Sequence, residues 1–170
     1  GGYFTGLFGI DQVLAAGGLI AVLTVILIAG IKESAAVAGL FTLIEAVGLI
    51  LIIVAGLPSL GSVDYLEMPL GISGVFTAAA LVFFAYQGFE EMVKFSEETR
   101  EPEKTVPKAL MIALAVCTLL YILVCIAAVS VVGWEGLAGS DAPFAEVATV
   151  AWGPWGADLL SVIALFATAN

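Results

Sequence analysis

The residues of this chain that could do chemistry gather at positions 81–91, LVFFAYQGFEE. An apolar, aromatic helical pattern runs into Gly88, and the carboxylates Glu90 and Glu91 follow within three residues. A helix broken at a glycine leaves backbone carbonyl and amide groups unpaired, and hydrocarbon tolerates them only where they line a cavity enclosed by protein. Such breaks hold substrates and coupling ions in secondary transporters. The alternative is a helix that ends at the membrane interface, with Gly88 as its C-cap and both acids in water.

Glu45 is the second chemical candidate, because it lies inside the apolar stretch FTLIEAVGLIL. A charged side chain near the bilayer centre costs about 2.5–3.5 kcal/mol on insertion scales, so such residues usually face a cavity or a partner. Glu45 lies ten residues beyond Ala35, which is about 15 Å of helix and favours depth over the interface. We therefore predict a cavity-lining or proton-titrating carboxylate. The alternative is a glutamate one or two turns from the cytoplasmic interface, either partly hydrated or paired with Lys32.

The other reactive groups indicate little chemistry. The chain has no histidine, and its apolar segments contain no nucleophile–base–acid constellation, so we expect neither an enzyme nor a metal or other cofactor. Cys117 and Cys125 lie eight residues apart in an uncharged segment. This is neither a metal spacing nor that of a redox pair, and we expect small buried thiols. With only five Lys and Arg in total, nucleic acid is not an expected partner.

Composition indicates the solvent around these residues. Of 170 residues, 62% are hydrophobic and 12% are charged, whereas soluble domains carry about 25% charged residues. We therefore expect an all-α integral membrane protein in a lipid bilayer. The lengths of the apolar runs predict membrane spans at about 13–31, 35–57, 72–89, 109–132 and 155–170, the last too short to cross. We interpret residues 1–170 as one incomplete membrane domain, an internal segment of a larger protein.

The basic residues predict the orientation of these spans. Lys32 lies between the first two spans, and the other four basic residues lie between the third and the fourth. The positive-inside rule then places loops 32–34 and 90–108 in the cytoplasm. The third span would run from outside to inside, with Gly88 and Glu90 toward its cytoplasmic half.

Residues 83–110, FFAYQGFEEMVKFSEETREPEKTVPKAL, resemble the sixth helix and following loop of the amino acid–polyamine–organocation (APC) permeases. That family shows an aromatic-rich FFAY-x-GF-[DE] run, followed by an E-E-x-x-x-P-x-(K/R)-x-(I/V)-P loop. The stretch GIKESAAVAGLFTLIEAVGLILIIVAGL is similar to the passage from the fourth to the fifth helix, and WGPWGADLLSVIALFATAN is similar to the start of the eighth. The resemblance covers nearly the whole chain. It implies an incomplete LeuT-like inverted-repeat fold, from the end of the third helix to part of the eighth.

The resemblance also implies substrate-binding roles. The sixth helix would be discontinuous, unwinding near Gly88, and the backbone carbonyls of Phe84 and Gln87 would accept hydrogen bonds from the amino group of a substrate. The ring of Phe84 would act as a gate over the bound molecule. The small side chain of Ala85 would leave room for the substrate.

The resemblance implies a role for Glu90 in coupling and gating. Glu45 matches a position that is often lysine in proton-coupled members, so the resemblance leaves the coupling ion open. The function implied is secondary active transport of amino acids or related amines by alternating access, coupled to H⁺ or Na⁺ or operating by exchange. The transporter would lie in the plasma membrane. The remaining helices of the parent transporter would complete the substrate site. Two alternatives stay open: an ion-conducting helical pore lined by Glu45 and Glu90, or a structural membrane subunit.

Overall fold

The computed structural model describes residues 9, 12–29, 31–88, 96 and 99–169. Every regular element in those residues is helical and none is a strand, which confirms the prediction of an all-α chain. The elements in chain order are α2 (Gln12–Ala29), α3 (Ile31–Gly56), η1 (Leu57–Ser59), α4 (Gly71–Phe83), η2 (Phe84–Tyr86), α6 (Pro102–Ala138), α7 (Pro143–Trp152) and α8 (Pro154–Ala169). They fall into two compact units, residues 64–122 and residues 1–63 with 123–170.

The helices follow the predicted apolar runs but end at different residues. Two stretches are long and apolar enough to cross a membrane, Ala36–Ser59 and Pro102–Ala138, whereas the other apolar helices of the described part are shorter. The helix α6 extends beyond the run at 109–132 in both directions. Hydropathy locates the part of a helix that suits hydrocarbon, but hydrogen bonding continues into the polar turns on either side. Membrane crossing by each span stays a prediction.

The ends of α6 and α7 have local causes. Pro102 begins α6, where a missing N–H is harmless, and Glu103 places a carboxylate in the first turn. Gly133, at φ 79° and ψ 161°, interrupts α6 near its end. The helix α7 lies between the predicted spans at 109–132 and 155–170, where sequence analysis predicted no helix. It begins at Pro143 and has Glu146 in its first turn, the same starting arrangement as α6.

In the unit of residues 1–63 and 123–170, α3, the second half of α6, α7 and α8 share a small core. The side chains of Ile52, Val147 and Leu160 are fully buried there. The ring of Phe41 on α3 meets the edge of Phe166 on α8 at a centroid distance of 5.2 Å. Small residues let helices approach closely in membranes, and Gly56 of α3 lies directly against Ala127 of α6.

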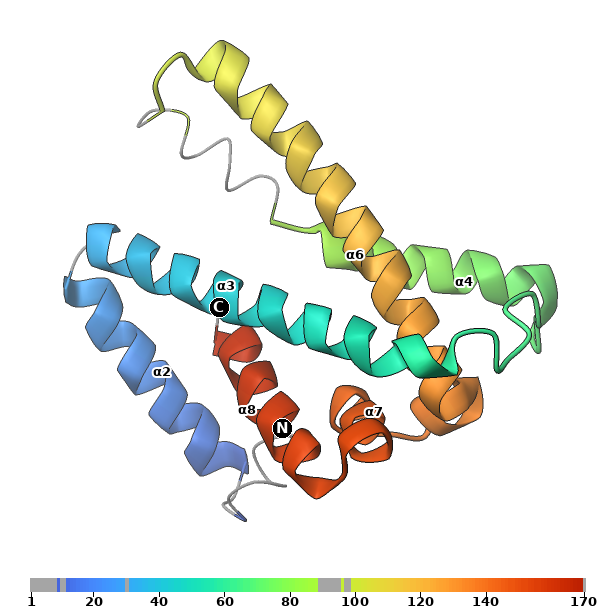
Figure 1. Ribbon diagram of the computed structural model, residues 1–170. Helices are drawn as coiled ribbons and strands as arrows, with labels where there is room; N and C mark the ends of the chain where they lie inside the picture. The colour runs from blue at the N-terminus through green and yellow to red at the C-terminus, as the bar shows by residue number, and fades with distance from the viewer. Residues whose placement is uncertain (1–8, 10–11, 30, 89–95, 97–98, 170) are drawn as a thin grey trace. The chain divides into compact units, whose positions relative to one another are not determined.

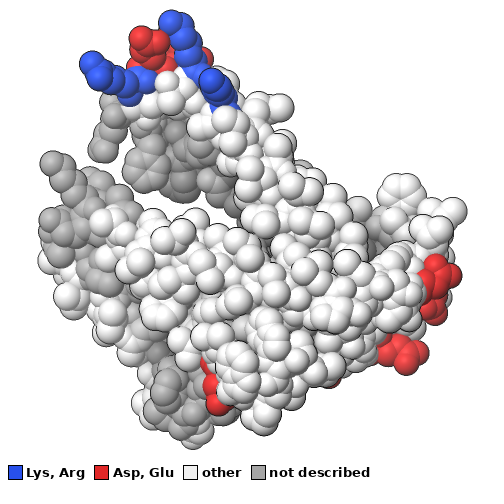
Figure 2. All heavy atoms as spheres, in the orientation of Figure 1, with Lys and Arg blue, Asp and Glu red and all other residues white. Residues whose placement is uncertain are grey.

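Large apolar side chains are exposed along most helices. Ile28 of α2 is 80% exposed and Phe76 of α4 is 72% exposed. Figure 2 shows basic and acidic side chains together at the start of α6, and residues 109–132 of that helix carry no charge. Soluble monomers rarely expose continuous apolar surface on this scale, and the surface suits an integral membrane protein.

Candidate functional site

The helical path of α4 ends just before Gly88. The turn η2 tightens the helix, and the Gln87 N–H donates to the Phe84 carbonyl at 3.2 Å. Gln87 is extended, with φ −62° and ψ 152°, and Gly88 has φ 107°, a conformation that favours glycine. Residues 89–95, including Glu90, lie outside the described residues, so a helix resuming beyond the glycine stays a prediction.

A cavity of about 700 Å³ lies beside this helix end, within the unit of residues 64–122. One wall comes from the end of α4, from η2 and from the two residues that follow. The other wall is the first half of α6. The lining residues are Phe83, Ala85, Tyr86, Gln87, Gly88, Leu110, Ala113, Leu114, Cys117, Thr118 and Tyr121. Non-helical backbone therefore meets a cavity, the setting in which such backbone is tolerated at membrane depth.

The structure brings together three of the four predicted substrate-binding residues. Ala85, Gln87 and Gly88 all line this cavity, but Phe84 does not. The Phe84 side chain is 70% exposed, and its carbonyl already accepts the Gln87 N–H. The gating role of its ring and the binding role of its carbonyl stay predictions.

Sequence analysis missed three hydroxyl side chains at the cavity. The hydroxyls of Tyr86 and Thr118 are 2.9 Å apart and share a hydrogen bond. Tyr121 donates from its hydroxyl to the Ala85 carbonyl at 3.4 Å. The Tyr86 and Tyr121 rings pack edge to face, with centroids 5.7 Å apart. The available signal was two polar side chains one turn apart, at positions 118 and 121, in an otherwise apolar run.

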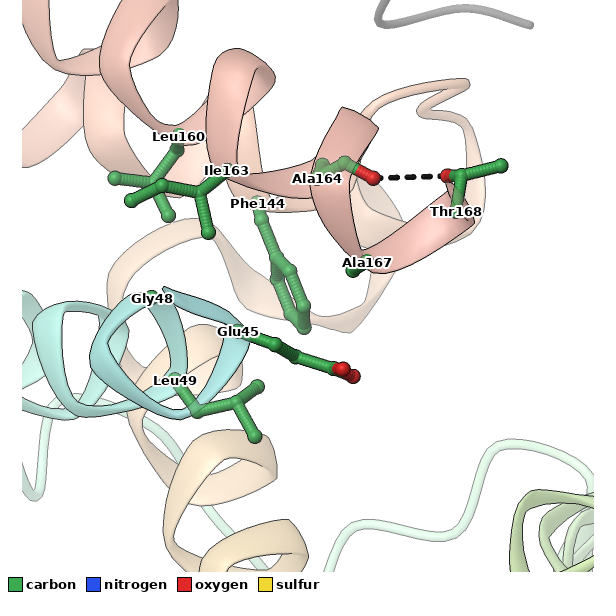
Figure 3. A pocket seen from close by; sticks show the side chains of 9 residues that line it. All are labelled: Glu45, Gly48, Leu49, Phe144, Leu160, Ile163, Ala164, Ala167 and Thr168. Carbon is green, nitrogen blue, oxygen red and sulfur yellow. Dashed lines mark hydrogen bonds between the residues drawn. The ribbon is translucent and has the colours of Figure 1, made fainter. Parts of the chain in front are cut away.

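Glu45 lines a different cavity, of about 250 Å³, within the unit of residues 1–63 and 123–170. Figure 3 shows it between α3 and α8, with the ring of Phe144 from α7 beside the Glu45 side chain and the carboxylate extending past that ring. The rest of the lining is Gly48, Leu49, Leu160, Ile163, Ala164, Ala167 and Thr168. Thr168 donates its hydroxyl to the Ala164 carbonyl at 2.8 Å, within its own helix. The lining supplies no cation, and the role of Glu45 in coupling stays a prediction.

The cysteines are free thiols in different surroundings. Cys117 is partly buried and lines the larger cavity. Cys125 is exposed on the same helix, so the expectation of a buried thiol is wrong there. No group of three or more His, Cys, Asp or Glu side chains suited to a metal ion occurs within the described ranges.

The sequence profile of the amino acid permease family matches residues 2–169. This chain belongs to the amino acid permease family. The resemblance to APC permeases is thereby confirmed, and the family is one of membrane transporters and not of enzymes. Membership also supports an integral membrane protein.

Several named permeases and transporters are similar to this family member over most of its length. The branched-chain amino acid permease BcaP of Bacillus subtilis is 34% identical over 145 residues, which are 85% of this chain and 31% of that protein. Cationic amino acid transporter 9, chloroplastic, of Arabidopsis thaliana is 36% identical over 129 residues, 75% of this chain and 22% of that protein. The methylthioribose transporter of Bacillus subtilis is 38% identical over 112 residues, 65% of this chain and 24% of that protein.

The permease chain therefore spans about a third or less of the length of these relatives. One relative is named as chloroplastic, so similarity does not select the plasma membrane. No solved structure matches the chain significantly.

Proposed function

We propose that this chain is part of a secondary transporter that moves amino acids or related amines across a membrane by alternating access. The observation that carries the proposal is the helix end at Gly88, where non-helical backbone lines a cavity of about 700 Å³. Family membership supplies the transport class. The complete transporter would have the LeuT-like inverted-repeat fold, with a discontinuous helix near Gly88 and further helices completing the site.

Backbone geometry supports amine recognition. The extended Gln87 diverts the chain from the helical path, so carbonyl groups of the last turn lose the donors that a continuing helix would provide. A substrate ammonium group offers several N–H donors and no acceptor, which matches a cluster of carbonyl oxygens. The Phe84 carbonyl can accept a second hydrogen bond besides that from Gln87, because a carbonyl oxygen has two lone pairs.

The substrate test uses the complete transporter in proteoliposomes with radiolabelled leucine, since one relative is named for branched-chain amino acids. We expect saturable uptake that valine competes for, and faster uptake when unlabelled leucine is inside. Arginine is the comparison, since another relative is named for cationic amino acids. Uptake that neither saturates nor shows exchange would favour a pore. Absence of any uptake by correctly inserted protein would favour a structural subunit.

We further propose that Glu45 and Glu90 take part in coupling or gating, with H⁺ as the first candidate ion. The placement of Glu45 beside a cavity supports this role, because a partly exposed carboxylate in an apolar helix needs a proton, a cation or water at membrane depth. A proton ionophore should collapse concentrative uptake, and Glu45→Gln should remove its dependence on the proton gradient while exchange continues. If uptake is indifferent to pH, to the ionophore and to Glu45→Gln, the proton hypothesis is wrong and Na⁺ or pure exchange remains.

The orientation and membrane are also part of the proposal. The segments 32–34 and 90–108, which α3 and α6 overlap, would face the cytoplasm, in the plasma membrane, because all the basic residues of the chain lie in them. Introducing single cysteines at positions 33 and 100, in a variant whose native cysteines are all replaced by serine, tests this with a membrane-impermeant maleimide on intact cells. Labelling of either cysteine from outside the cell would contradict the predicted orientation.

A further inference from the structure

Two tyrosines and a threonine connect the helix end at the cavity to α6. Tyr86 reaches across to the Thr118 hydroxyl at 2.9 Å, and Tyr121 reaches back to the Ala85 carbonyl at 3.4 Å. Their rings meet edge to face between these two hydrogen bonds, at 5.7 Å and 69°. We call Tyr86, Thr118, Tyr121 and the Ala85 carbonyl the tyrosine clasp. All four belong to the unit of residues 64–122.

Thr118 differs from most hydroxyl residues of the described helices. The usual partner is the carbonyl four residues earlier in the same helix, as for Thr24, Thr42, Thr77, Thr149 and Thr168. Such a bond satisfies the hydroxyl locally and says nothing about a neighbouring element. Thr118 instead bonds a side chain 32 positions away in sequence. The bond therefore fixes tertiary structure.

The Ala85 carbonyl explains why such a connection is useful. In a continuous helix this carbonyl would accept the N–H of residue 89. Gln87 leaves the helical conformation, and the Tyr121 hydroxyl donates to the Ala85 carbonyl at 3.4 Å. A hydrogen bond is stronger in a low-dielectric setting than in water. The clasp thus ties the last turn to α6 where helical bonding ends.

We propose that Tyr86, Thr118 and Tyr121 are positioning residues, which hold the backbone of Gln87 and Gly88 toward the cavity so that it can bind the substrate amine. This inference rests on the proposed transport function. Gln87 and Gly88 directly follow the clasped residues and line the same cavity. Loss of the clasp should weaken substrate binding more than it slows the transport cycle.

The first test measures the KM and Vmax of leucine uptake by the complete transporter in proteoliposomes. We expect Thr118→Val and Tyr86→Phe each to raise KM about two- to tenfold, the range for one hydrogen bond, with Vmax changed less than KM. The KM of the double variant should be no higher than that of either single variant, because both changes remove the same hydrogen bond. Thr118→Ser keeps the hydroxyl and should restore the wild-type KM. Thr24→Val is the matched control, because its hydroxyl donates to the Ile20 carbonyl of its own helix, and its KM should equal that of wild type.

The second test reads binding directly, through the thiol at Cys117, in a variant of the complete transporter in which every other cysteine, including Cys125, is replaced by serine. Cys117 lines the cavity next to Thr118, so leucine should protect it from alkylation by a maleimide. The protecting concentration should rise in Thr118→Val by the same factor as KM. This measurement stays informative for a variant that binds but does not transport.

The outcomes separate the clasp from the function on which it rests. The clasp is overturned if wild-type uptake is saturable but Thr118→Val and Tyr86→Phe leave both the KM and the protection of Cys117 unchanged. The transport proposal then stays intact. The same holds if Thr118→Ser behaves like Thr118→Val, since the hydroxyl is then not the cause. Wild-type protein that neither takes up nor binds leucine or arginine overturns both.

Discussion

Replacing Gly56 with alanine should destabilise the crossing of α3 and α6. A Cβ atom at Gly56 would lie 2.5 Å from the Ala127 Cβ, 2.6 Å from its Cα and 2.9 Å from its carbonyl oxygen. Non-bonded carbon atoms prefer about 3.5–4.0 Å, and two of these three neighbours are backbone atoms that cannot rotate away. The two helices would have to separate at this point.

The net effect is a difference between two opposing terms. Forcing an extra methyl group into a well-packed core costs about 1–3 kcal/mol. Alanine in a helix interior recovers about 0.5–1 kcal/mol relative to glycine. Gly56 has φ −81°, an ordinary helical value, so its backbone conformation adds no strain on substitution. The two terms leave a net loss in the free energy of unfolding of about 0–2.5 kcal/mol, centred on about 1 kcal/mol.

Two other glycines of α3 provide matched controls. Nothing lies within 4 Å of a Cβ built at Gly39, so Gly39→Ala should be neutral or stabilise by up to about 1 kcal/mol. A Cβ at Gly48 would meet chiefly the Ile163 Cγ2 methyl, a side-chain end that can move, so Gly48→Ala should fall between the other two.

The assay is thermal unfolding of the complete transporter in mild detergent, followed by the loss of the monodisperse elution peak. The midpoints should rank Gly39→Ala at or above wild type, then Gly48→Ala, then Gly56→Ala. A midpoint for Gly56→Ala equal to that of Gly39→Ala would refute the close contact between α3 and α6.

Three further substitutions give expectations of different kinds. Gly88→Ala forces a side chain into φ 107°, which costs about 1–3 kcal/mol. Leucine uptake should therefore fall strongly, while surface biotinylation shows normal insertion. Normal uptake would argue against a functional role for the backbone at Gly88. Ser62→Ala removes the hydroxyl that donates to the Ser130 carbonyl at 2.6 Å and should lower stability by about 0.5–1.5 kcal/mol in the same thermal assay. Lys104→Ala breaks the 3.1 Å ion pair with Glu101, whose two side chains are 83% and 72% exposed. The midpoint of thermal unfolding should not change, because exposed pairs contribute little to stability. A clear drop in the midpoint would indicate a partner for Lys104 other than Glu101.

The helices were predictable where one physical property decided them. Long apolar runs gave α3 and α6, because a chain surrounded by hydrocarbon must satisfy its backbone within a helix. The ends of α6 were less predictable, since its first turns are polar and owe their structure to Pro102 and Glu103. The helix α7 was missed because its ten residues are too few for a membrane span, and the acidic residues around it resemble a solvated loop.

The backbone of the candidate site was more predictable than its side-chain partners. A glycine two residues before a pair of acids, after an aromatic run, indicated where the helix would end. The positive φ of Gly88 explains why that position suits glycine. The placement of Phe84 could not be predicted in the same way. Which side of a tightened turn faces a cavity depends on the rotation introduced by η2, and no helical periodicity describes that rotation.

The hydroxyl residues show most clearly where local sequence stops being informative. Thr118 and Thr149 both lie inside apolar helical stretches, and each could bond the carbonyl four residues earlier. Thr149 does so, whereas Thr118 bonds Tyr86, because η2 brings a tyrosine hydroxyl within 2.9 Å. The difference lies in the neighbouring element and not in the threonine or its flanking residues. A hydroxyl on an apolar helix therefore marks a candidate site only when a non-helical segment packs against it, and in the described part of this chain the segment at Gly88 meets that condition.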